Sequence, residues 1–359
     1  MLLGCRMKIL LFHPLKSTNT GDNVILQGTE NILRQAFLDV EFIHQEFTND
    51  ETMPRFDRLE VDLFVVSGTP WFWHVCHRSM KYKQLAKVVA LYKDVKKIGL
   101  GLGSCYPLTT NIFSNFIYPN ENVGGGDWRK DDVECIKNSF GKFDLLFTRD
   151  SVAQEILKVA GIESYETVCP AVFAYDGDRY IYQPVKDKSL LIFQHPERSL
   201  SQDSCDKEFS RPYVEFQFKL VEKYKMEVKT ASPLDSDWLR DVGLLKCERE
   251  VDGGVPYSTW IKNPTELMQV LIQYNPVVSC RVHEAIPSRM LGNLTYILPM
   301  DTRFLTATKV GVLPLWPYGY PLDLLELPTP DLDKINIFTQ RKVKEGRLVM
   351  IEKLREVLK

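Results

Sequence analysis

Short apolar runs alternate along this chain with longer segments of helical periodicity, and this alternation limits the folds that the chain can adopt. In the first half, the apolar runs are Lys8–Phe12, Val40–Ile43, Asp62–Gly68, Lys97–Ser104 and Leu145–Asp150. Amphipathic stretches accompany them at Val24–Phe37, Leu85–Val95 and Ser151–Val159, the last of which is stopped by Gly161. A strand without polar alternation must be covered on both faces, so the pattern predicts a parallel sheet with helical crossovers.

A polar, turn-rich segment at 176–188 separates this series from a second one, and we expect the domain boundary there. The second series has predicted strands at Leu190–Phe193, Glu227–Thr230, Val277–Ser279 and Leu294–Leu298, and helices at Pro212–Tyr224, Leu267–Tyr274, Ala285–Leu291 and Arg341–Leu358. The predicted fold class is α/β, with two Rossmann-like, doubly wound domains (1–178 and 179–359) facing a cleft. The C-terminal helix could pack back on the first domain.

The composition excludes several classes of function. With 45 basic and 47 acidic residues, the chain has a net charge of −2, so we expect neither nucleic acid nor an anionic membrane surface as a partner. Its eight cysteines include no Cys-x-x-Cys pair and no cluster at metal-ligand spacing, which predicts free thiols in a reducing compartment and no metal site. No run approaches the roughly 20 apolar residues of a membrane helix. We therefore predict a cytoplasmic protein without a membrane span, while an oligomer remains possible.

The clearest candidate site follows the apolar run that ends at Ser279. Arg281, His283 and Glu284 come directly after this strand and before a predicted helix. In open α/β sheets, ligands bind beyond the carboxyl ends of the strands, and a helix N-terminus offers unpaired N–H groups to an anion. Arg281 and His283 could therefore hold one phosphate or carboxylate from two sides. The alternative is a surface arginine beside a partly buried, hydrogen-bonded histidine.

Two other strand ends carry charged residues. Asn19 and Asp22 lie in the loop after the first strand, where Asp22 is either the N-cap of the next helix or a general base aimed into the cleft. Arg149 and Asp150 end a later strand; Asp150 could cap the following helix and Arg149 could reach the cleft. The carboxyl ends of parallel strands meet at one sheet edge, so these residues could converge.

Aromatic and glycine-rich segments allow weaker predictions. Trp71, Trp73 and His74 follow a strand end and could form a platform that stacks on a sugar ring, although a buried aromatic cluster is at least as common. The glycines of 99–103 recur at every second residue inside a strand, so we reject a nicotinamide cofactor. Gly124–Asp127 is better explained as a loop or lid than as a phosphate cradle.

Five motifs in order resemble the polysaccharide pyruvyl transferase family. They are Asn19-x-Gly21-Asp22, Val65–Gly68, Gly101-x-Gly103, Thr148–Ser151 with Leu157 and Gly161, and Ser279–His283. The resemblance covers about Lys8 to Asp301 and implies two Rossmann-like domains of the GT-B type. It also implies transfer of a pyruvyl group from phosphoenolpyruvate to a sugar of a glycan, with formation of a pyruvate ketal and release of phosphate. The Arg281-x-His283 pair is then expected to hold the donor.

This chemistry suggests roles for the candidate residues. Arg281, Arg149 and the helix N-terminus would neutralise the donor, and Glu284 is predicted to bind the donor together with them and His283. His283 is the candidate for the acid or for phosphate neutralisation, and Asp22 for the base that takes the acceptor hydroxyl proton. The acceptor side is predicted to contain Asn19, Trp71, Trp73 and His74.

The expected partners are phosphoenolpyruvate and a glycan or sugar acceptor, and neither a metal nor a cofactor is expected. Two alternatives remain on the same fold. One is a GT-B glycosyltransferase with a sugar-nucleotide donor, and the other is a non-catalytic glycan-binding protein.

Overall fold

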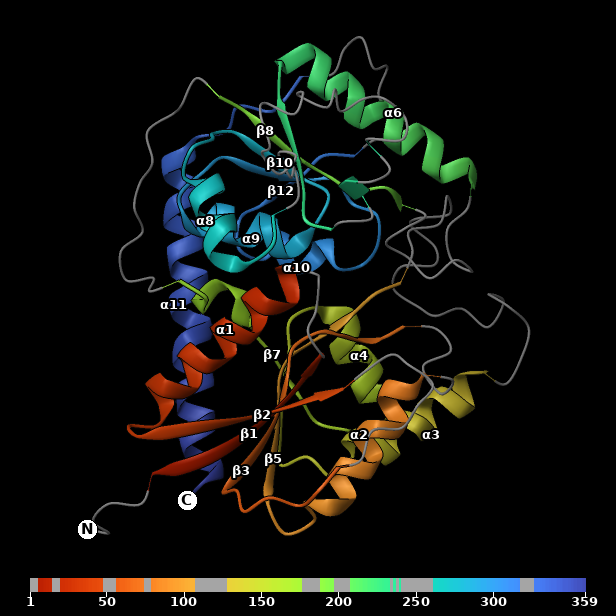
Figure 1. Ribbon diagram of the computed structural model, residues 1–359, viewed down its shortest axis with the longest axis vertical. Helices are drawn as coiled ribbons and strands as arrows, with labels where there is room; N and C mark the ends of the chain where they lie inside the picture. The colour runs from red at the N-terminus through yellow and green to blue at the C-terminus, as the bar shows by residue number, and fades with distance from the viewer. Residues whose placement is uncertain are drawn as a thin grey trace, which may run out of the picture.

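A computed structural model gives the structure of the protein (Figure 1). It describes residues 6–14, 20–47, 56–73, 79–106, 128–175, 188–196, 207–232, 235, 236, 239, 261–316 and 326–359. Two parallel sheets form the centres of two domains, and the chain completes the first sheet before it enters the second. The predicted fold class is confirmed.

The first domain is built around a seven-stranded parallel sheet with the order β2-β1-β3-β5-β6-β7, in which β4 also pairs with β5. Alternate side chains of β1 enter different cores, since Ile9 and Leu11 face α1 whereas Leu10 and Phe12 face α2. The strands are β1 (Met7–Pro14), β2 (Val40–Phe47), β3 (Leu63–Ser67), β4 (Pro70–Phe72), β5 (Lys96–Ser104), β6 (Leu145–Thr148) and β7 (Tyr165–Glu166). The helices are α1 (Thr20–Ala36), α2 (Met80–Leu91), α3 (Trp128–Phe140), α4 (Ser151–Val159) and the 3₁₀ turn η2 (Pro170–Phe173).

The second domain contains a five-stranded parallel sheet with the order β12-β11-β10-β8-β9. Strand β10 lies at its centre, paired with β8 on one side and β11 on the other. The strands are β8 (Leu190–Phe193), β9 (Glu227–Thr230), β10 (Val277–Ser279), β11 (Thr295–Ile297) and β12 (Leu313–Pro314). The helices are α6 (Lys207–Tyr224), α8 (Pro264–Leu271), α9 (Val282–Met290), α10 (Phe304–Thr308) and α11 (Leu332–Val357).

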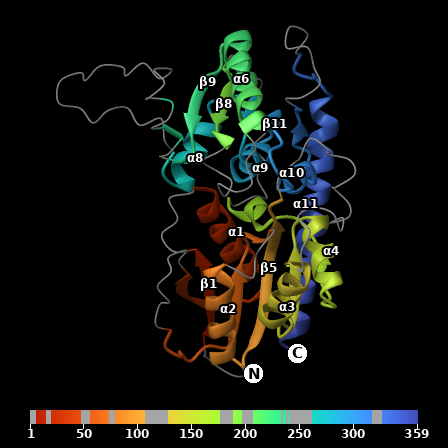
Figure 2. The same cartoon turned by 90° about the vertical axis from the view of Figure 1, so that its right-hand side faces the viewer.

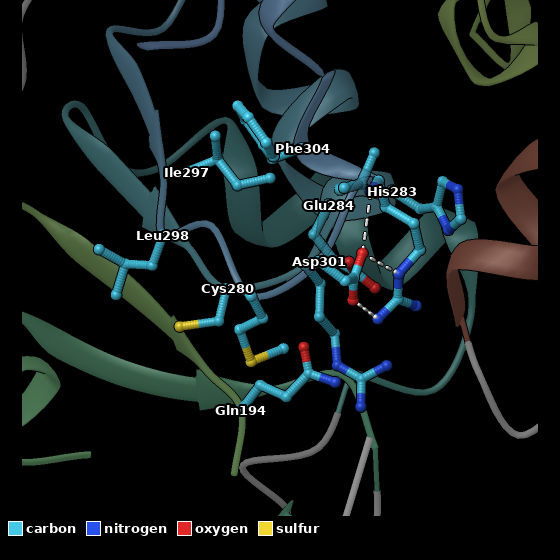
Figure 3. Close-up of a pocket in the computed structure, with 12 residues that line it drawn as sticks. Gln194, Cys280, His283, Glu284, Ile297, Leu298, Asp301 and Phe304 are labelled. Carbon is cyan, nitrogen blue, oxygen red and sulfur yellow. Dashed lines mark hydrogen bonds and ion pairs between the residues drawn. The ribbon is translucent and has the colours of Figure 1, made fainter. Parts of the chain in front are cut away.

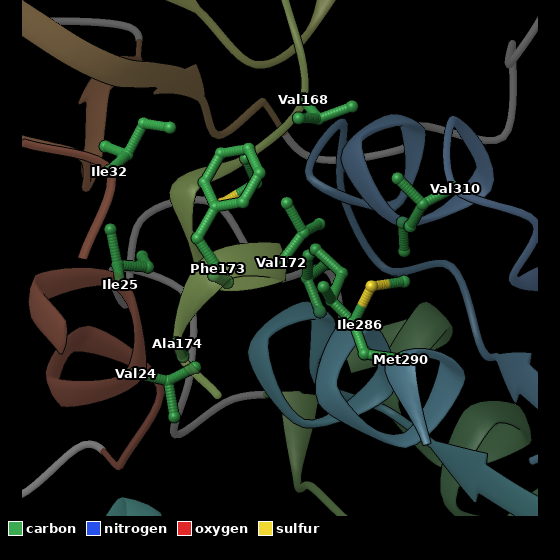
Figure 4. Close-up of a cluster of buried hydrophobic side chains, with 14 of the residues drawn as sticks. Val24, Ile25, Ile32, Val168, Val172, Phe173, Ala174, Ile286, Met290 and Val310 are labelled. Carbon is green, nitrogen blue, oxygen red and sulfur yellow. The ribbon is translucent and has the colours of Figure 1, made fainter. Parts of the chain in front are cut away.

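A shared apolar core joins the two domains along α1, η2 and α9. Figure 4 shows Val24 and Ile25 of α1, Val172 of η2 and Ile286 of α9 converging in this core. Gly28 of α1 allows the closest approach, because a Cβ there would lie 1.8 Å from the carbonyl oxygen of Pro170. The domains therefore do not face an open cleft along this side, and the candidate site lies next to a firmly packed interface.

Helix α11 starts in the second domain and runs back along the first (Figure 2). Arg355 near its end donates hydrogen bonds from Nε to the carbonyl oxygen of Ala36 (3.0 Å) and from Nη2 to that of Gln35 (3.1 Å). Gly346 lets α11 pack closely against Val168, which follows β7, because a Cβ at position 346 would lie 2.6 Å from Val168 Cγ2. In the described part of the chain, none of the helices combines the length and apolarity that crossing a bilayer requires.

Several helices begin earlier than the apolar periodicity predicts, because their N-caps decide where they start. α11 begins at Leu332 and not at Arg341, since the Asp331 side chain accepts a hydrogen bond from the Lys334 N–H. In α8 the Asn263 side chain accepts from the Glu266 N–H (2.9 Å), which moves its start to Pro264. The most consequential shift is in α9, which begins at Val282 and so includes His283 and Glu284 in its first turn.

Candidate functional site

The site forms where β10 ends and α9 begins. Arg281 is the N-cap residue of α9, with an extended backbone (φ −122°, ψ 132°). The Ser279 hydroxyl stabilises this turn, because it donates to the Arg281 carbonyl oxygen (2.8 Å) and accepts from the Arg281 N–H (3.0 Å). The first turn of α9 therefore follows β10 after a single tight connection, and its unpaired N–H groups face the carboxyl edge of the sheet.

A pocket of about 360 Å³, part of it open to solvent, lies at this edge (Figure 3). Polar and charged groups on its wall come from β10–α9 and from the segment before α10, and apolar side chains close the other side. The lining residues are Gln194, Cys280, Arg281, Val282, His283, Glu284, Ile297, Leu298, Met300, Asp301, Arg303 and Phe304. Three residues predicted from the sequence, Arg281, His283 and Glu284, are thus brought together.

Two arginines line the pocket, and a buried aspartate fixes each of them. Arg281 Nη2 lies 2.9 Å from Asp235 Oδ2, and the Arg281 side chain is 14% exposed. Arg303 forms a two-pronged pair with Asp301, with Nε 2.8 Å from Oδ1 and Nη2 2.5 Å from Oδ2. Paired guanidinium groups of this kind are oriented before any ligand arrives. Arg303 was not predicted from the sequence, because it follows β11 without any pattern that marks it.

His283 touches both domains. Its Nε2 lies 2.9 Å from Arg149 Nη1, and arginine can only donate, so Nε2 accepts and the ring proton resides on Nδ1. On the other side, a Cβ at Gly21 would lie 2.5 Å from His283 Cβ, which places the N-terminus of α1 directly against the ring. Burial and then the charges of Arg149, Arg303 and Arg281 hold the pKa of His283 well below its usual value. His283 is therefore a neutral imidazole at physiological pH.

Arg149 stands behind His283 and not on the pocket wall. It is fully buried, and its Nε and Nη2 have no hydrogen-bond partner among the described atoms. Its guanidinium fits only beside a glycine, because a Cβ at Gly103 would lie 2.1 Å from Arg149 Nε. Arg149 is not among the residues that line the pocket and contacts it through His283, so direct binding of the donor by Arg149 stays a prediction.

Glu284 is the most unusual group in the pocket. It is 1% exposed, and neither carboxyl oxygen has a hydrogen-bond partner on another described residue; its own backbone N–H is the donor beside it. Burial raises the pKa of Glu284 to about 7 and Asp22 adds to the rise, while Arg281, the residue's own backbone N–H and Arg303 oppose it. A buried carboxyl that titrates near neutrality can give or take a proton under physiological conditions.

Asp22 lies in the first turn of α1, which begins at Thr20. Asp22 lies two residues after the start of the helix, so it is not the N-cap residue of α1. The charge of Asp22 acts on both Glu284 and Arg303, raising the pKa of each, so Asp22 belongs to the same electrostatic surroundings as the pocket. Among the positions predicted to converge, Arg149 and His283 are in contact and Arg281 lines the same pocket as His283; a role of Asp22 in the site stays a prediction.

Asp150 joins the two domains next to the site. Its carboxylate caps α4 by accepting from the Ala153 N–H (2.8 Å) and also accepts from the N–H and hydroxyl of Ser104 (2.9 and 2.8 Å). The Ser104 hydroxyl in turn lies 2.7 Å from the Thr302 hydroxyl of the second domain. Thr302 is adjacent to both Asp301 and Arg303, so this network sets the position of the Arg303 pair relative to the first domain.

The predicted acceptor platform is only partly available. Trp71 is fully buried, with its ring 5.4 Å from those of Phe47 and Phe140, so it cannot stack on a sugar and that prediction is wrong for Trp71. The reason is that Pro70–Phe72 forms β4, which turns the Trp71 side chain into the core. Trp73 is partly buried, with Lys81 Nζ 3.9 Å from its ring centre. Asn19, His74 and Gly124–Asp127 lie outside the described residues.

Among the described residues, no group of three or more His, Cys, Asp or Glu side chains is arranged to hold a metal ion. The described cysteines, Cys105, Cys135, Cys169 and Cys280, are free thiols. The polar chemistry of the pocket therefore comes from arginine, carboxyl and imidazole groups.

Comparison with known proteins places the fold and the family. A protein assigned as a UDP-N-acetylglucosamine 2-epimerase from Listeria monocytogenes is 11% identical, covers 97% of this chain and 91% of that chain, and has a TM-score of 0.50. The UDP-GlcNAc 2-epimerase of Methanocaldococcus jannaschii is 12% identical, with 96% and 94% covered and a TM-score of 0.47. An uncharacterized protein of Klebsiella pneumoniae is 16% identical, with 82% and 83% covered and a TM-score of 0.42.

These likenesses concern the fold alone, and the likeness to the Listeria protein agrees with a GT-B type fold of two parallel-sheet domains. A search of the curated proteins finds no match. A family model described as polysaccharide pyruvyl transferase matches residues 19–292, a range that includes Asp22, Arg149, Arg281, His283 and Glu284. Because the match spans well over half of the 359 residues, the chain belongs to the polysaccharide pyruvyl transferase family and is a transferase that acts on polysaccharide.

Proposed function

We propose that this protein transfers the pyruvyl group of phosphoenolpyruvate to a sugar of a glycan, forming a pyruvate ketal and releasing phosphate. The observation that carries the proposal is the pocket at the start of α9, where Arg281 and Arg303 are held by buried aspartates next to His283. Family membership supports the transfer of a pyruvyl group. The two arginines in the pocket support the binding of a small anionic donor.

Phosphoenolpyruvate carries a carboxylate and a phosphate on one small carbon frame, so its site needs two cationic groups at short range. Arg281 and Arg303 meet this need, since arginine binds either anion through paired N–H groups. The free N–H groups of the first turn of α9 add a third source of positive potential. His283 remains neutral in this arrangement and offers hydrogen bonding, not charge, which favours its role in phosphate binding over its role as the acid.

The acceptor approaches from the first domain in this proposal. Asp22 is the candidate base for the sugar hydroxyl, because it faces Glu284 and Arg303 from the N-terminus of α1. Among the described residues, Trp73 remains the aromatic candidate for contact with the sugar. Arg149 fixes the ring of His283 from behind and acts as a positioning residue.

The test is incubation of the protein with phosphoenolpyruvate and a panel of glycans, with acceptor mass and inorganic phosphate measured together. We expect one phosphate released for each pyruvyl group gained. Arg281→Ala should mainly raise the KM for phosphoenolpyruvate, because it removes uniform binding of the donor. A parallel panel of sugar nucleotides tests the glycosyltransferase alternative. Melting-temperature shifts with a sugar nucleotide and none with phosphoenolpyruvate would overturn the proposal.

A further inference from the structure

Glu284 differs from the other buried carboxylates near the site in having no hydrogen-bond partner on another described residue. Asp150, Asp235 and Asp301 are equally buried, and each accepts two or more hydrogen bonds from backbone or side-chain donors. Both oxygens of Glu284 lack a partner on any other described residue, although the residue lines the pocket. Leaving buried acceptors unpaired costs about 1–3 kcal/mol. A group kept in this state at a pocket wall points to a role toward the ligand.

The charges around Glu284 come from both domains. Arg281 precedes it on the same turn, Arg303 faces it from the α10 side, and Asp22 faces it from α1. Tyr175, whose hydroxyl donates to the Pro264 carbonyl oxygen at 2.9 Å, is the fourth titratable neighbour. The two arginines favour the carboxylate, and burial with Asp22 favours the protonated acid. Burial prevails, so the group is protonated in a substantial fraction of molecules at neutral pH.

We infer that Glu284 is a catalytic residue that donates the proton to the methylene carbon of phosphoenolpyruvate, while Asp22 accepts the proton of the attacking sugar hydroxyl. The inference rests on the proposed function and changes the role predicted for Glu284 from donor binding to proton donation. It also takes the role of acid away from His283, whose Nε2 lone pair is already used by Arg149 Nη1 at 2.9 Å.

The step balances in atoms and electrons. The carbon–carbon double bond takes the proton of Glu284 at the methylene carbon, and the cationic centre that develops at the neighbouring carbon is attacked by the sugar oxygen, whose proton passes to Asp22. A second hydroxyl then forms its bond to that carbon as the bond to the phosphate oxygen breaks. The phosphate leaves with the electron pair and takes up the second hydroxyl proton. Transfer of the proton from Asp22 to Glu284 restores the starting state.

The arrangement predicts that donor binding and proton uptake are linked. An anion placed between Arg281 and Arg303 compensates the two charges that favour the Glu284 carboxylate, so the bound donor shifts Glu284 toward its protonated form. At pH 7 the wild-type protein should take up as much as about half a proton more than Glu284→Gln on binding phosphoenolpyruvate. Titration calorimetry in two buffers of different ionisation enthalpy measures this difference without any turnover.

The experiment compares the wild type with Glu284→Gln, which keeps the side-chain shape, and with Glu155→Gln on exposed α4 as the matched control. Glu284→Gln should bind phosphoenolpyruvate within a few-fold of the wild type, lose the extra proton uptake, and lose transfer by about 10²–10⁴-fold. Glu284→Asp should recover part of the transfer rate. Glu155→Gln should match the wild type in all three measurements.

Wild-type transfer by Glu284→Gln would overturn the inference, and so would loss of donor binding together with the rate, which would return Glu284 to a binding role. The melting temperature of each variant establishes that it is folded. Failure of the proposed function gives a different result, because the wild-type protein itself would then neither bind phosphoenolpyruvate nor release phosphate.

Discussion

Gly103→Ala tests whether His283 must be held in place by Arg149. A Cβ at position 103 would lie 2.1 Å from Arg149 Nε and 2.6 Å from Cζ. Ordinary contacts begin near 3.4 Å, so the guanidinium must move by more than 1 Å. Arg149 is fully buried, so its guanidinium can move only by displacing or rearranging neighbouring side chains. Its 2.9 Å hydrogen bond to His283 should therefore break.

The expected losses can be worked out separately for stability and for activity. Overpacking costs about 1–3 kcal/mol, and the smaller entropy of the unfolded alanine chain offsets about 0.4–1 kcal/mol of it. Misplacement of a catalytic group by about 1 Å can lower the rate by about 10²-fold. We therefore expect a modestly destabilised variant whose kcat/KM for pyruvyl transfer falls by roughly that factor.

Gly99→Ala in the same strand is the matched control. Its Cβ would meet Leu146 Cδ2 at 2.7 Å, a similar overlap, but with the end of an apolar side chain far from His283. It should lower the denaturant midpoint without a specific loss of transfer per folded molecule. The assay is phosphate release at 25 °C together with urea unfolding. If Gly103→Ala transferred pyruvate as fast as Gly99→Ala, the Arg149–His283 contact would have no part in function.

Three further outcomes follow from the contacts in and around the pocket. Asp235→Asn should destabilise the protein by about 3–5 kcal/mol, because it leaves Arg281 without its buried partner. Phosphoenolpyruvate can then compensate the charge of Arg281, so it should raise the melting temperature of this variant more than that of the wild type. Equal shifts would argue against Arg281 as a donor ligand. Thr302→Val removes hydrogen bonds to the Ser104 hydroxyl and the Tyr106 N–H. It should lower the free energy of unfolding, measured in urea, by about 1–3 kcal/mol. An unchanged urea midpoint would show that this contact does not hold the domains together. The pKa of Glu284 rises from 4.5 to about 7 on folding, so its contribution to stability is complete below pH 4.5 and is lost as the pH rises to about 7. Glu284→Gln should thus stabilise the protein by about 3 kcal/mol above pH 7 and by little at pH 4, which thermal unfolding across pH can disprove.

Much of the fold could be predicted from local patterns. The β1–α1 and β6–α4 units have their predicted places because a doubly covered strand and an amphipathic helix are each defined by their own periodicity. Ser151–Val159 agrees with α4 residue for residue, because Asp150 caps one end and Gly161, with φ +72°, allows the chain to leave the other. The start of α9 was placed three residues late, since Arg281 caps that helix without any side-chain hydrogen bond that a sequence pattern could reveal.

The site could be predicted only where its residues follow a strand directly. Arg281 and His283 were found in this way. Arg303, Asp235 and Asp301 were missed, because each is recruited by a contact that depends on the packing of distant segments. Trp71 shows the opposite error: an aromatic residue beyond a strand end looks available to a ligand, but the chain continues into β4 and the side chain enters the core. Local sequence marks a strand end and does not say whether the chain turns toward or away from the ligand.

The charge balance of the pocket explains why its acid should be a carboxyl and not the imidazole. Arg281 and Arg303 each have an aspartate partner, yet together with Arg149 they still suppress protonation of His283. The same positive charges favour the ionised form of Glu284, but burial outweighs them and raises the pKa of Glu284 to about 7, so that both the ionised and the protonated form are populated at neutral pH. An arriving anion removes the opposing influence of the arginines and so increases the protonated fraction of Glu284. Glu284 would then be largely protonated only when the donor is bound, so that the proton is in place when the methylene carbon of the donor is beside it.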